Sequence, residues 1–546
     1  MALFRRLRAP LALFRRLRAP LALSLLAVAV VAAPATSGAT RAPGGSDLAT
    51  GAAVAPGLSV GTAAAAAPNV VLFVVDDATV EDITYMPKVQ DRLIVRGTTF
   101  TRHYVPYPLC CPSRATIFTG LYPHNHRVLG NFDPYGGFYG FKDTQTIATW
   151  LTDDYATSLV GKYFNDYADT NADRRYVPPG WDAWKGSVEP GTYNYLRQQL
   201  NLNGRLVDFP GVYSTSLFGQ QGRLFLEHQG SKEPFFLYES FVAPHNGPPR
   251  DPDDLYAHNP YVEPKYRDTY TGPLVPTDNG VPDPSYDEAD VSDKQSGVEN
   301  LPRLSRDEIA AQKESLVQRR EALRTVDDEI GRTMDMIRRM GELDNTYFIL
   351  VSDNGYLQGQ HRIAAGKSVA YEPAARVPLI IRGPGIQVGG TYDGLTGMQD
   401  LAPTILSMTD EWDATIPPLD GRSLLPLLDG ETTDRPIVLE VADAPTVSEQ
   451  KVATSTDESR FVKRDDRAAL TGTASLQIEW LARGIVTPDR WKYVTYPQTG
   501  GVEMYDLTAD PYELENLAGN PDYADKQAAL DAEWRQYRYC DAVQCW

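Results

Sequence analysis

Residues 69–77 have the sequence Asn-Val-Val-Leu-Phe-Val-Val-Asp-Asp. The first seven form an uninterrupted apolar run rich in β-branched side chains, which is typical of a strand buried on both faces of a parallel sheet. Asp76 and Asp77 follow at once, at the edge where open α/β sheets bind ligands. Adjacent carboxylates repel each other unless a cation lies between them. The stretch therefore predicts an α/β fold with a candidate cation site, with an ordinary solvated turn as the alternative.

Strand and helix patterns alternate along the chain after this stretch. Strands are expected at 157–160, 234–242, 346–352 and 377–381, and helices at 86–96, 112–119, 144–152, 213–229 and 306–340. The last of these helices opens with a capping box, Ser305-x-x-Glu308. The alternation predicts a mostly parallel sheet flanked by helices.

The pattern changes near residue 436. Further strands are expected at 436–441, 460–462 and 491–496, and a helix at 522–537. We therefore expect a catalytic domain over 68–435 and a smaller α+β subdomain over 436–546. Residues 247–304 are irregular and rich in Pro, Asp, Tyr and Gly, which predicts either a substrate-facing excursion or a flexible surface loop.

The first residues have the pattern of a secretory leader. Residues 1–40 combine arginines, a short apolar stretch and small residues, which predicts a cleaved signal peptide, with an uncleaved anchor as the alternative. The apolar stretch is shorter than the about 20 residues of a membrane span, and no later stretch is apolar enough to be one. Residues 41–67 predict a disordered spacer. We expect a secreted or cell-envelope protein, and the lack of an Asn-x-Ser/Thr sequon favours a bacterial origin.

Composition limits the partners. Hydrophobic residues make up 42% and charged residues 23% of the 546 positions, as in an ordinary globular enzyme. The net charge of −19 argues against a nucleic-acid partner. Cys540 and Cys545 lie near the carboxyl terminus, where a disulfide would pin the tail of an exported protein; a metal site is the alternative.

The other two cysteines belong to the string Cys110-Cys111-Pro112-Ser113-Arg114, continued by Ala-Thr-Ile-Phe-Thr-Gly. Proline favours the first position of a helix, so a helix is expected to begin just after Cys110. The N–H groups and the dipole at that end favour an anion. Arg114 lies in the same turn and offers a planar fork of donors to an anionic oxygen.

A second pair of oxygen donors follows the strand expected at 346–352. Asp353 and Asn354 lie at its carboxyl end, as Asp76 and Asp77 lie at the end of the first strand. Together the four side chains offer only oxygen ligands. Ca²⁺ and Mg²⁺ prefer such a set, whereas zinc normally recruits histidine or cysteine.

These motifs resemble the type I sulfatases, the formylglycine-dependent family. Cys-x-Pro-Ser-Arg followed by Thr-Gly is similar to the family signature, and SDNGYLQGQHRIAAGKSVAYEPAARVPLIIR at 352–382 resembles the family over its whole length. The resemblance implies an alkaline-phosphatase-like α/β fold and hydrolysis of sulfate esters. It also implies that a formylglycine-generating enzyme oxidises Cys110 to an aldehyde, whose hydrate is the nucleophile, while Cys111 fills the free position of the motif.

The resemblance further implies a metal and a set of site residues. It assigns Ca²⁺, or Mg²⁺ as the alternative, to the four oxygen donors, with residue 110 also near the ion. Lys162 is then a sulfate ligand, Lys367 lies near the bridging oxygen, and Arg114 holds the modified side chain. His245 contacts the sulfate and protonates the leaving alcohol, although a lone histidine is more often structural. Many sulfatases have Gly-Lys-x-His at 161–164, but Phe164 stands where that histidine would be, so its role is unassigned.

Two further strings resemble the N-acetylglucosamine-6-sulfatase and arylsulfatase branch: Gly-Lys-Tyr-x-Asn ending at Asn165 and Tyr-Pro-His-Asn-His at 122–126. They imply a sulfated small molecule or glycan as substrate, contacted by Asn165, His124 and His126, with ordinary loop packing as the alternative for the histidines. The rival functions are a phosphodiesterase or phosphonate monoester hydrolase of the same superfamily, a non-catalytic glycan-binding relative and a plain thiol enzyme.

Overall fold

The computed structural model describes residues 66–151, 154–169, 173–230, 233–251, 254, 259–270, 276–278, 281–442 and 479–546. The signal peptide predicted at 1–40, nearly all of the spacer at 41–67 and the strand expected at 460–462 lie outside these residues. Among the described helices, none is both long and apolar enough to cross a bilayer.

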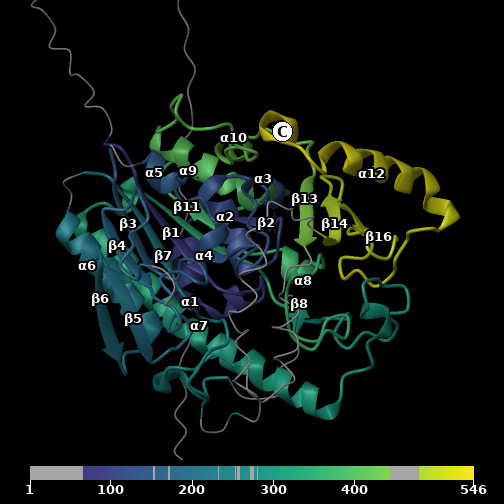
Figure 1. Cartoon of the computed structure of the whole chain (residues 1–546), viewed down its shortest axis with the longest axis horizontal. Coiled ribbons are helices and arrows are strands. Elements are labelled where there is room, and N and C mark those ends of the chain that lie inside the picture. Colours follow the sequence, from purple (N-terminus) through teal and green to yellow (C-terminus); the bar gives the residue numbers. More distant parts are fainter. Residues whose placement is uncertain are drawn as a thin grey trace, which may run out of the picture. The chain divides into compact units, whose positions relative to one another are not determined.

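Ten strands of the described chain form one large sheet (Figure 1). In space they follow the order β12 (Gly390–Gly397), β2 (Thr98–Tyr104), β11 (Leu379–Arg382), β10 (Thr346–Ser352), β1 (Asn69–Val75), β7 (Phe235–Ser240), β3 (Ala156–Gly161), β4 (Ala183–Ser187), β5 (Arg197–Leu202) and β6 (Arg205–Pro210). The central strands from β10 to β4 pair in parallel. Strand β11 and the β4–β5–β6 edge pair antiparallel.

Alternate side chains of β1 enter two hydrophobic cores, one on each face of the sheet. Residues 70, 72 and 74 pack with the helices of one face, and residues 71, 73 and 75 pack with those of the other. The first face carries α2 (Cys110–Thr119), α5 (Ile147–Trp150) and α9 (Leu401–Thr409). The second carries α6 (Ser214–Gln229) and α7 (Arg306–Met340). Burial on both faces explains why the run is apolar at every position.

A second sheet follows along the chain. Its four described strands are antiparallel: β13 (Ile437–Ala442), β14 (Trp480–Val486), β15 (Trp491–Tyr496) and β16 (Gly501–Asp506). One face packs against residues that precede α2, such as Tyr104 and Leu109. The other face is covered by α12 (Ala524–Tyr537), which buries Leu530 and Trp534.

The structure confirms the predicted α/β fold with a smaller carboxyl-terminal α+β part. The capping box also forms, because the Ser305 side chain accepts from the Glu308 N–H at 3.2 Å. The helical segment expected at 86–96 consists of a short α1 (Pro87–Val89) followed by a π-helical turn over Gln90–Ile94. Strand β5, Arg-Gln-Gln-Leu-Asn-Leu, was not predicted, because most of its side chains are polar.

Candidate active site

The predicted oxygen donors meet at the carboxyl edge of the central strands. Val75 at the end of β1 pairs with Ser352 at the end of β10, so the residues that follow the two strands lie side by side. The backbone N–H of Asp77 donates to Oδ1 of Asp353 at 3.2 Å. Asn354 Nδ2 donates to Oδ1 of Asp77 at 2.6 Å.

Helix α2 brings a cysteine and an arginine to this edge. It begins at Cys110 itself, with extended Leu109 as the N-cap, rather than just after Cys110 as the proline predicted. The Cys110 Sγ lies 3.5 Å from Oδ1 of Asp76. One turn later, Arg114 donates from Nε to Asp353 at 2.9 Å and from Nη1 to Ser240 Oγ at 2.8 Å. Ser240 ends β7, and its role was not predicted.

Three more of the predicted residues complete the cluster. Lys162, directly after β3, forms an ion pair with Asp76. Lys367 Nζ lies 2.8 Å from Cys110 Sγ and 2.5 Å from Oδ1 of Asp77. His245 Nε2 lies 3.7 Å from Oδ2 of Asp77. The side chains of His245 and Lys367 are 17% and 9% exposed, whereas Asp76, Asp77 and Lys162 are essentially inaccessible, so the cluster opens to solvent at His245 and Lys367.

Charge compensation fixes the protonation states. Burial would raise the pKa of Asp76 and Asp77, but the ammonium groups of Lys162 and Lys367 outweigh it and lower both values. Burial would likewise lower the pKa of the two lysines, but the neighbouring carboxylates outweigh burial and raise both values. All four groups therefore stay charged at neutral pH. Burial raises the pKa of the Cys110 thiol well above its usual range, so an unmodified thiol stays protonated there.

The cluster could hold a metal ion, and Asp76, Asp77 and Asn354 offer the oxygen atoms that a hard divalent cation prefers. Ligand atoms of Asp76, Asp77, Cys110 and His245 all lie within 4.8 Å of one another. The buried Oδ1 of Asn354 has no hydrogen-bond partner among the described residues, which leaves an amide oxygen free to act as a ligand. The aspartates and the basic side chains around them balance in charge: Asp76, Asp77 and Asp353 against Arg114, Lys162 and Lys367. A divalent cation would leave the site net positive and suited to an anion.

The sulfatase family model matches residues 68–411, a span that contains every residue of this cluster. The chain belongs to the sulfatase family. The extracellular sulfatase SULF-1 homolog of Drosophila melanogaster is 34% identical over 374 residues, which are 66% of this chain and 31% of that protein. The N-acetylglucosamine-6-sulfatase of Homo sapiens is 30% identical over 471 residues, which are 83% of this chain and 81% of that protein.

A sulfatase-type fold is also found among solved structures. One, described as a complex with its substrate D-glucosamine-2-N,6-O-disulfate, has a TM-score of 0.62 and 22% identity, and covers 86% of this chain and 97% of its own. At that identity the likeness shows the fold alone. The chain spans 31% to 58% of the length of the first three curated relatives that it matches.

Sequence reasoning missed a tyrosine of this sulfatase site. The ring of Tyr193 lies 4.7 Å from Lys162 Nζ and 4.6 Å from the His245 ring. Its hydroxyl donates to Oδ1 of Asn165 at 2.9 Å, and the Cys111 thiol donates to the same oxygen at 3.5 Å. Asn165 thus lies beside the cluster but is bonded within the protein. Tyr193 comes from a segment without sequence periodicity, so only its aromatic character gave a signal.

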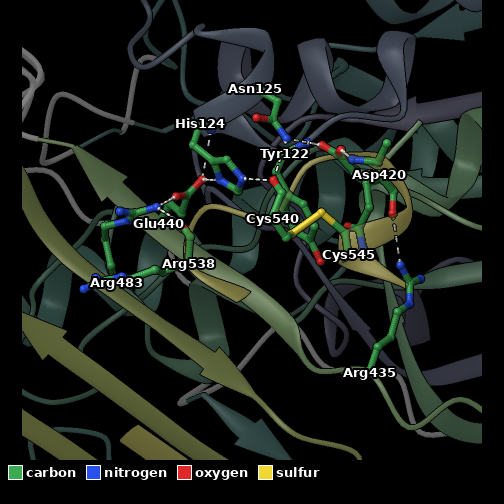
Figure 2. The surroundings of a disulfide bond; sticks show 12 residues. Tyr122, His124, Asn125, Asp420, Arg435, Glu440, Arg483, Arg538, Cys540 and Cys545 are labelled. Carbon is green, nitrogen blue, oxygen red and sulfur yellow. Dashed lines mark hydrogen bonds and ion pairs between the residues drawn. A yellow bond between two sulfur atoms is a disulfide. The ribbon is translucent and has the colours of Figure 1, made fainter. Parts of the chain in front are cut away.

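The structure does not bring His124 and His126 to this cluster as free side chains. His124 Nδ1 lies 2.9 Å from Oε2 of Glu440, and its Nε2 lies 2.8 Å from the Cys540 carbonyl (Figure 2). His126 Nε2 lies 3.0 Å from Thr116 Oγ1, and its Nδ1 accepts from a backbone N–H at 3.0 Å. Both rings are buried and fully hydrogen-bonded, which favours the alternative of structural packing.

The carboxyl-terminal cysteines lie next to His124. Cys540 and Cys545 form a disulfide, and the Cys540 carbonyl accepts from His124 and from Asn125 Nδ2 (Figure 2). The end of the chain is thereby fastened to the segment that follows α2.

Proposed function

We propose that the chain hydrolyses sulfate esters, with sulfated sugars such as 6-O-sulfated N-acetylglucosamine as substrates and aryl sulfates as surrogates. One observation carries this proposal: the buried Cys110 lies beside the Asp76 carboxylate on one side and the partly exposed ammonium of Lys367 on the other. The match to the sulfatase family over 68–411 gives that arrangement its reaction class.

Two groups must be added to the polypeptide. A formylglycine-generating enzyme would convert Cys110 to formylglycine, and Ca²⁺, or Mg²⁺ in its place, would bind Asp76, Asp77, Asp353 and Asn354. The hydrated aldehyde supplies a nucleophilic oxygen, and the cation supplies a Lewis acid. The free Oδ1 of Asn354 and the surrounding carboxylates support this ligand set.

The chain's own cations bind the sulfate and stabilise the charge that develops on its oxygens. Lys162 and Lys367 are held by buried carboxylates, so they need no reorganisation when a sulfate arrives. Arg114 is fixed by Asp353, Ser240 and the Lys162 carbonyl, which makes it a rigid support for residue 110. Fixed donors of this kind typically contribute about 10²- to 10³-fold each to the rate.

His245 is placed to protonate the leaving oxygen. Its Nδ1 lies 2.7 Å from the Asn246 carbonyl, which can only accept, so Nδ1 carries a hydrogen. Nε2 is then the nitrogen that gains and releases the exchangeable proton. It lies at the solvent-exposed part of the cluster, where a bulky alcohol can leave.

The sugar assignment rests on the relatives. The human protein of 30% identity is an N-acetylglucosamine-6-sulfatase, and it is matched over most of both chains. We propose a related sugar here, with Asn165 and Tyr193 beside it. The extracellular sulfatases among the relatives support secretion of this protein. We also propose that the protein is bacterial.

The test combines a mass measurement with turnover. Protein made together with a formylglycine-generating enzyme should yield a tryptic peptide 103–114 that has lost sulfur and gained an aldehyde, and should hydrolyse an aryl sulfate faster than an aryl phosphate diester. Cys110→Ala should reduce that turnover by about 10⁴-fold or more, because the nucleophile is gone. Cys111→Ala, the matched control, should keep most of it.

Full turnover in Cys110→Ala would refute the assignment, and faster diester hydrolysis would favour the phosphodiesterase alternative. A screen of sulfated monosaccharides then names the substrate.

A further inference from the structure

A hollow in the surface is lined by none of the residues of the Cys110 cluster. It has a volume of about 230 Å³ and is lined by residues of α9, the segment after it and the carboxyl-terminal turn. We propose that this hollow binds a pyranose unit of an N-acetylglucosamine-containing glycan, as an anchoring site separate from the active site. The choice of polymer rests on the proposed function, whereas the choice of a sugar ring rests on the side chains that line the hollow.

Two tryptophans make part of the lining of the hollow aromatic. Trp412 and Trp546 both line it, and they are 47% and 46% exposed, although indole rings are normally mostly buried. Trp412 is held in place because its Nε1–H donates to Ser407 Oγ at 3.1 Å. One face of a pyranose carries only C–H groups and packs well on an indole, while its rim of hydroxyl groups stays available.

Polar groups of both signs complete the lining. The guanidinium of Arg422 lies 5.9 Å from the Trp546 ring centroid, and Glu431 and Thr433 line the same hollow. Arg422 and Glu431 are both exposed. The third charged residue of the lining, Arg435, is already paired with Asp400. An isolated anion would therefore meet one guanidinium without an ion-pair partner in the described part of the chain, that of Arg422, and one carboxylate, that of Glu431. A neutral ring with many hydroxyl groups satisfies both charges and both aromatic faces, which is why we assign a sugar.

Helix α2 separates this hollow from the active site. Cys110 begins the helix, and Gly120 caps its other end. The N–H of Gly421, a lining residue of the hollow, donates to the Gly120 carbonyl at 3.0 Å. The ten residues of α2 rise 1.5 Å each, so the two sites lie on the order of 15 Å apart along its axis. A bound ring in the hollow therefore does not occupy the catalytic cluster, and a longer glycan is needed to use both.

The binding test uses the full chain with Cys110→Ala, so that nothing is hydrolysed. A neutral N-acetylglucosamine tetrasaccharide and its 6-O-sulfated form are titrated, with ligand-observed saturation-transfer NMR as the readout. We expect saturable binding of the neutral sugar, weakened about tenfold or more by Trp412→Ala or Trp546→Ala, since one lost aromatic contact of about 1.4 kcal/mol is a factor of ten. Tyr539→Ala, which removes another exposed ring outside the hollow, should change nothing. Arg422→Gln tests the polar side of the site without removing a ring.

Two results with the neutral sugar would overturn the proposal. In the first, the neutral sugar does not bind. In the second, it binds equally well to the parent and to both tryptophan variants, whose melting temperatures are unchanged. Binding that requires the sulfate and is equal in the parent and both tryptophan variants would report only the active site, and also overturns the proposal. With Cys110 intact, the tryptophan variants should leave aryl sulfate turnover unchanged and raise KM for the sulfated tetrasaccharide. If no sulfate ester is turned over at all, the proposed function fails while the binding result still stands or falls by itself.

Discussion

Two buried clusters of histidine, carboxylate and arginine lie beyond opposite ends of helix α2. At the amino end, ligand atoms of Asp76, Asp77 and His245 lie within 4.8 Å of the Cys110 thiol, and Arg114 pairs with Asp76. At the carboxyl end, His124 contacts Glu440, which also pairs with Arg483 (Figure 2). The residue types are the same, but the second cluster uses every donor and acceptor of its histidine, whereas the first leaves the Asn354 carbonyl oxygen without a partner among the described residues and His245 partly exposed.

The difference separates a binding site from a structural contact. Buried polar groups are normally paired, so an unpaired one needs an explanation, and a missing ligand is the simplest in a cluster that balances its own charge. The His124 cluster also leaves one buried atom unpaired, the Nε of Arg483, but that guanidinium is already paired with Glu440 and lies 4.4 Å from the Trp480 ring centroid, so it needs no ligand. The cluster joins the segment after α2, strand β13 and the disulfide-bonded tail. The comparison can be tested one carboxylate at a time.

Matched substitutions in the first cluster and next to the second should give the largest contrast. Asp353→Asn removes the charge that holds Arg114 and one proposed metal ligand, and should lower kcat/KM for an aryl sulfate by about 10²- to 10³-fold. The matched residue is Asp420, next to the second cluster, whose carboxylate accepts from Asn125 Nδ2 and from the N–H groups of Tyr122 and Ala542. Asp420→Asn loses one of these acceptors and should cost about 1–3 kcal/mol of stability but leave kcat/KM unchanged. Kinetics, bound-metal analysis and urea unfolding measure all three effects. Equal losses of activity in both variants would show that the comparison is wrong.

Tyr193 should give a smaller, substrate-dependent effect. Its ring lies between the Lys162 ammonium and the His245 imidazole, so we regard it as a positioning residue. Tyr193→Leu should lower kcat for a sugar sulfate by about tenfold, as expected for a lost cation–π contact of about 1.4 kcal/mol. The loss should be smaller for nitrophenyl sulfate, because a good leaving group needs little protonation.

The conservative variant is the control for that effect. Tyr193→Phe keeps the ring and loses only the hydrogen bond to Asn165, so it should retain most of the activity. If Tyr193→Leu loses the same factor on both substrates, the tyrosine does not act through His245. Bound metal should be unchanged in both variants, because neither removes a ligand.

The sequence pattern predicted that four members of the first cluster lie at one edge of the sheet, because these four follow strands. Asp76, Asp77, Asp353 and Lys162 each come directly after a strand, and the carboxyl ends of parallel strands share one edge, so local patterns fix their meeting place. The second cluster gave no such signal. The partner of His124 is 316 positions away in the chain, on an antiparallel strand whose place no local rule determines. Tyr193 was missed for the same reason, since a loop rather than a strand end carries it to His245.

His124 of the second cluster and the nearby buried His126 should respond to pH in opposite directions. Burial would lower the pKa of His124, but Glu440 raises it above its ordinary 6.5. Its contribution to stability is therefore fully present below pH 6.5 and is lost as the pH rises through the higher folded value. The pKa of Glu440 is lowered, so its share persists above pH 4.5 and is lost as the pH falls through its folded value. Burial lowers the pKa of His126 to about 3, so protonation of its unfolded form below pH 6.5 destabilises the fold.

Urea unfolding of His124→Asn and His126→Asn at pH 5.5 and pH 8.5 checks these signs. Relative to the parent, His124→Asn should be the more damaging at pH 5.5, by about 1–3 kcal/mol, because a charged hydrogen bond is lost there. His126→Asn should be the less damaging at pH 5.5, because the variant no longer has to keep a buried ring neutral. If the stability of the two variants changed with pH in the same direction, Glu440 would not be stabilising a protonated His124. The contact between the segment after α2, strand β13 and the disulfide-bonded tail would then be stabilised by packing and the disulfide rather than by an ion pair.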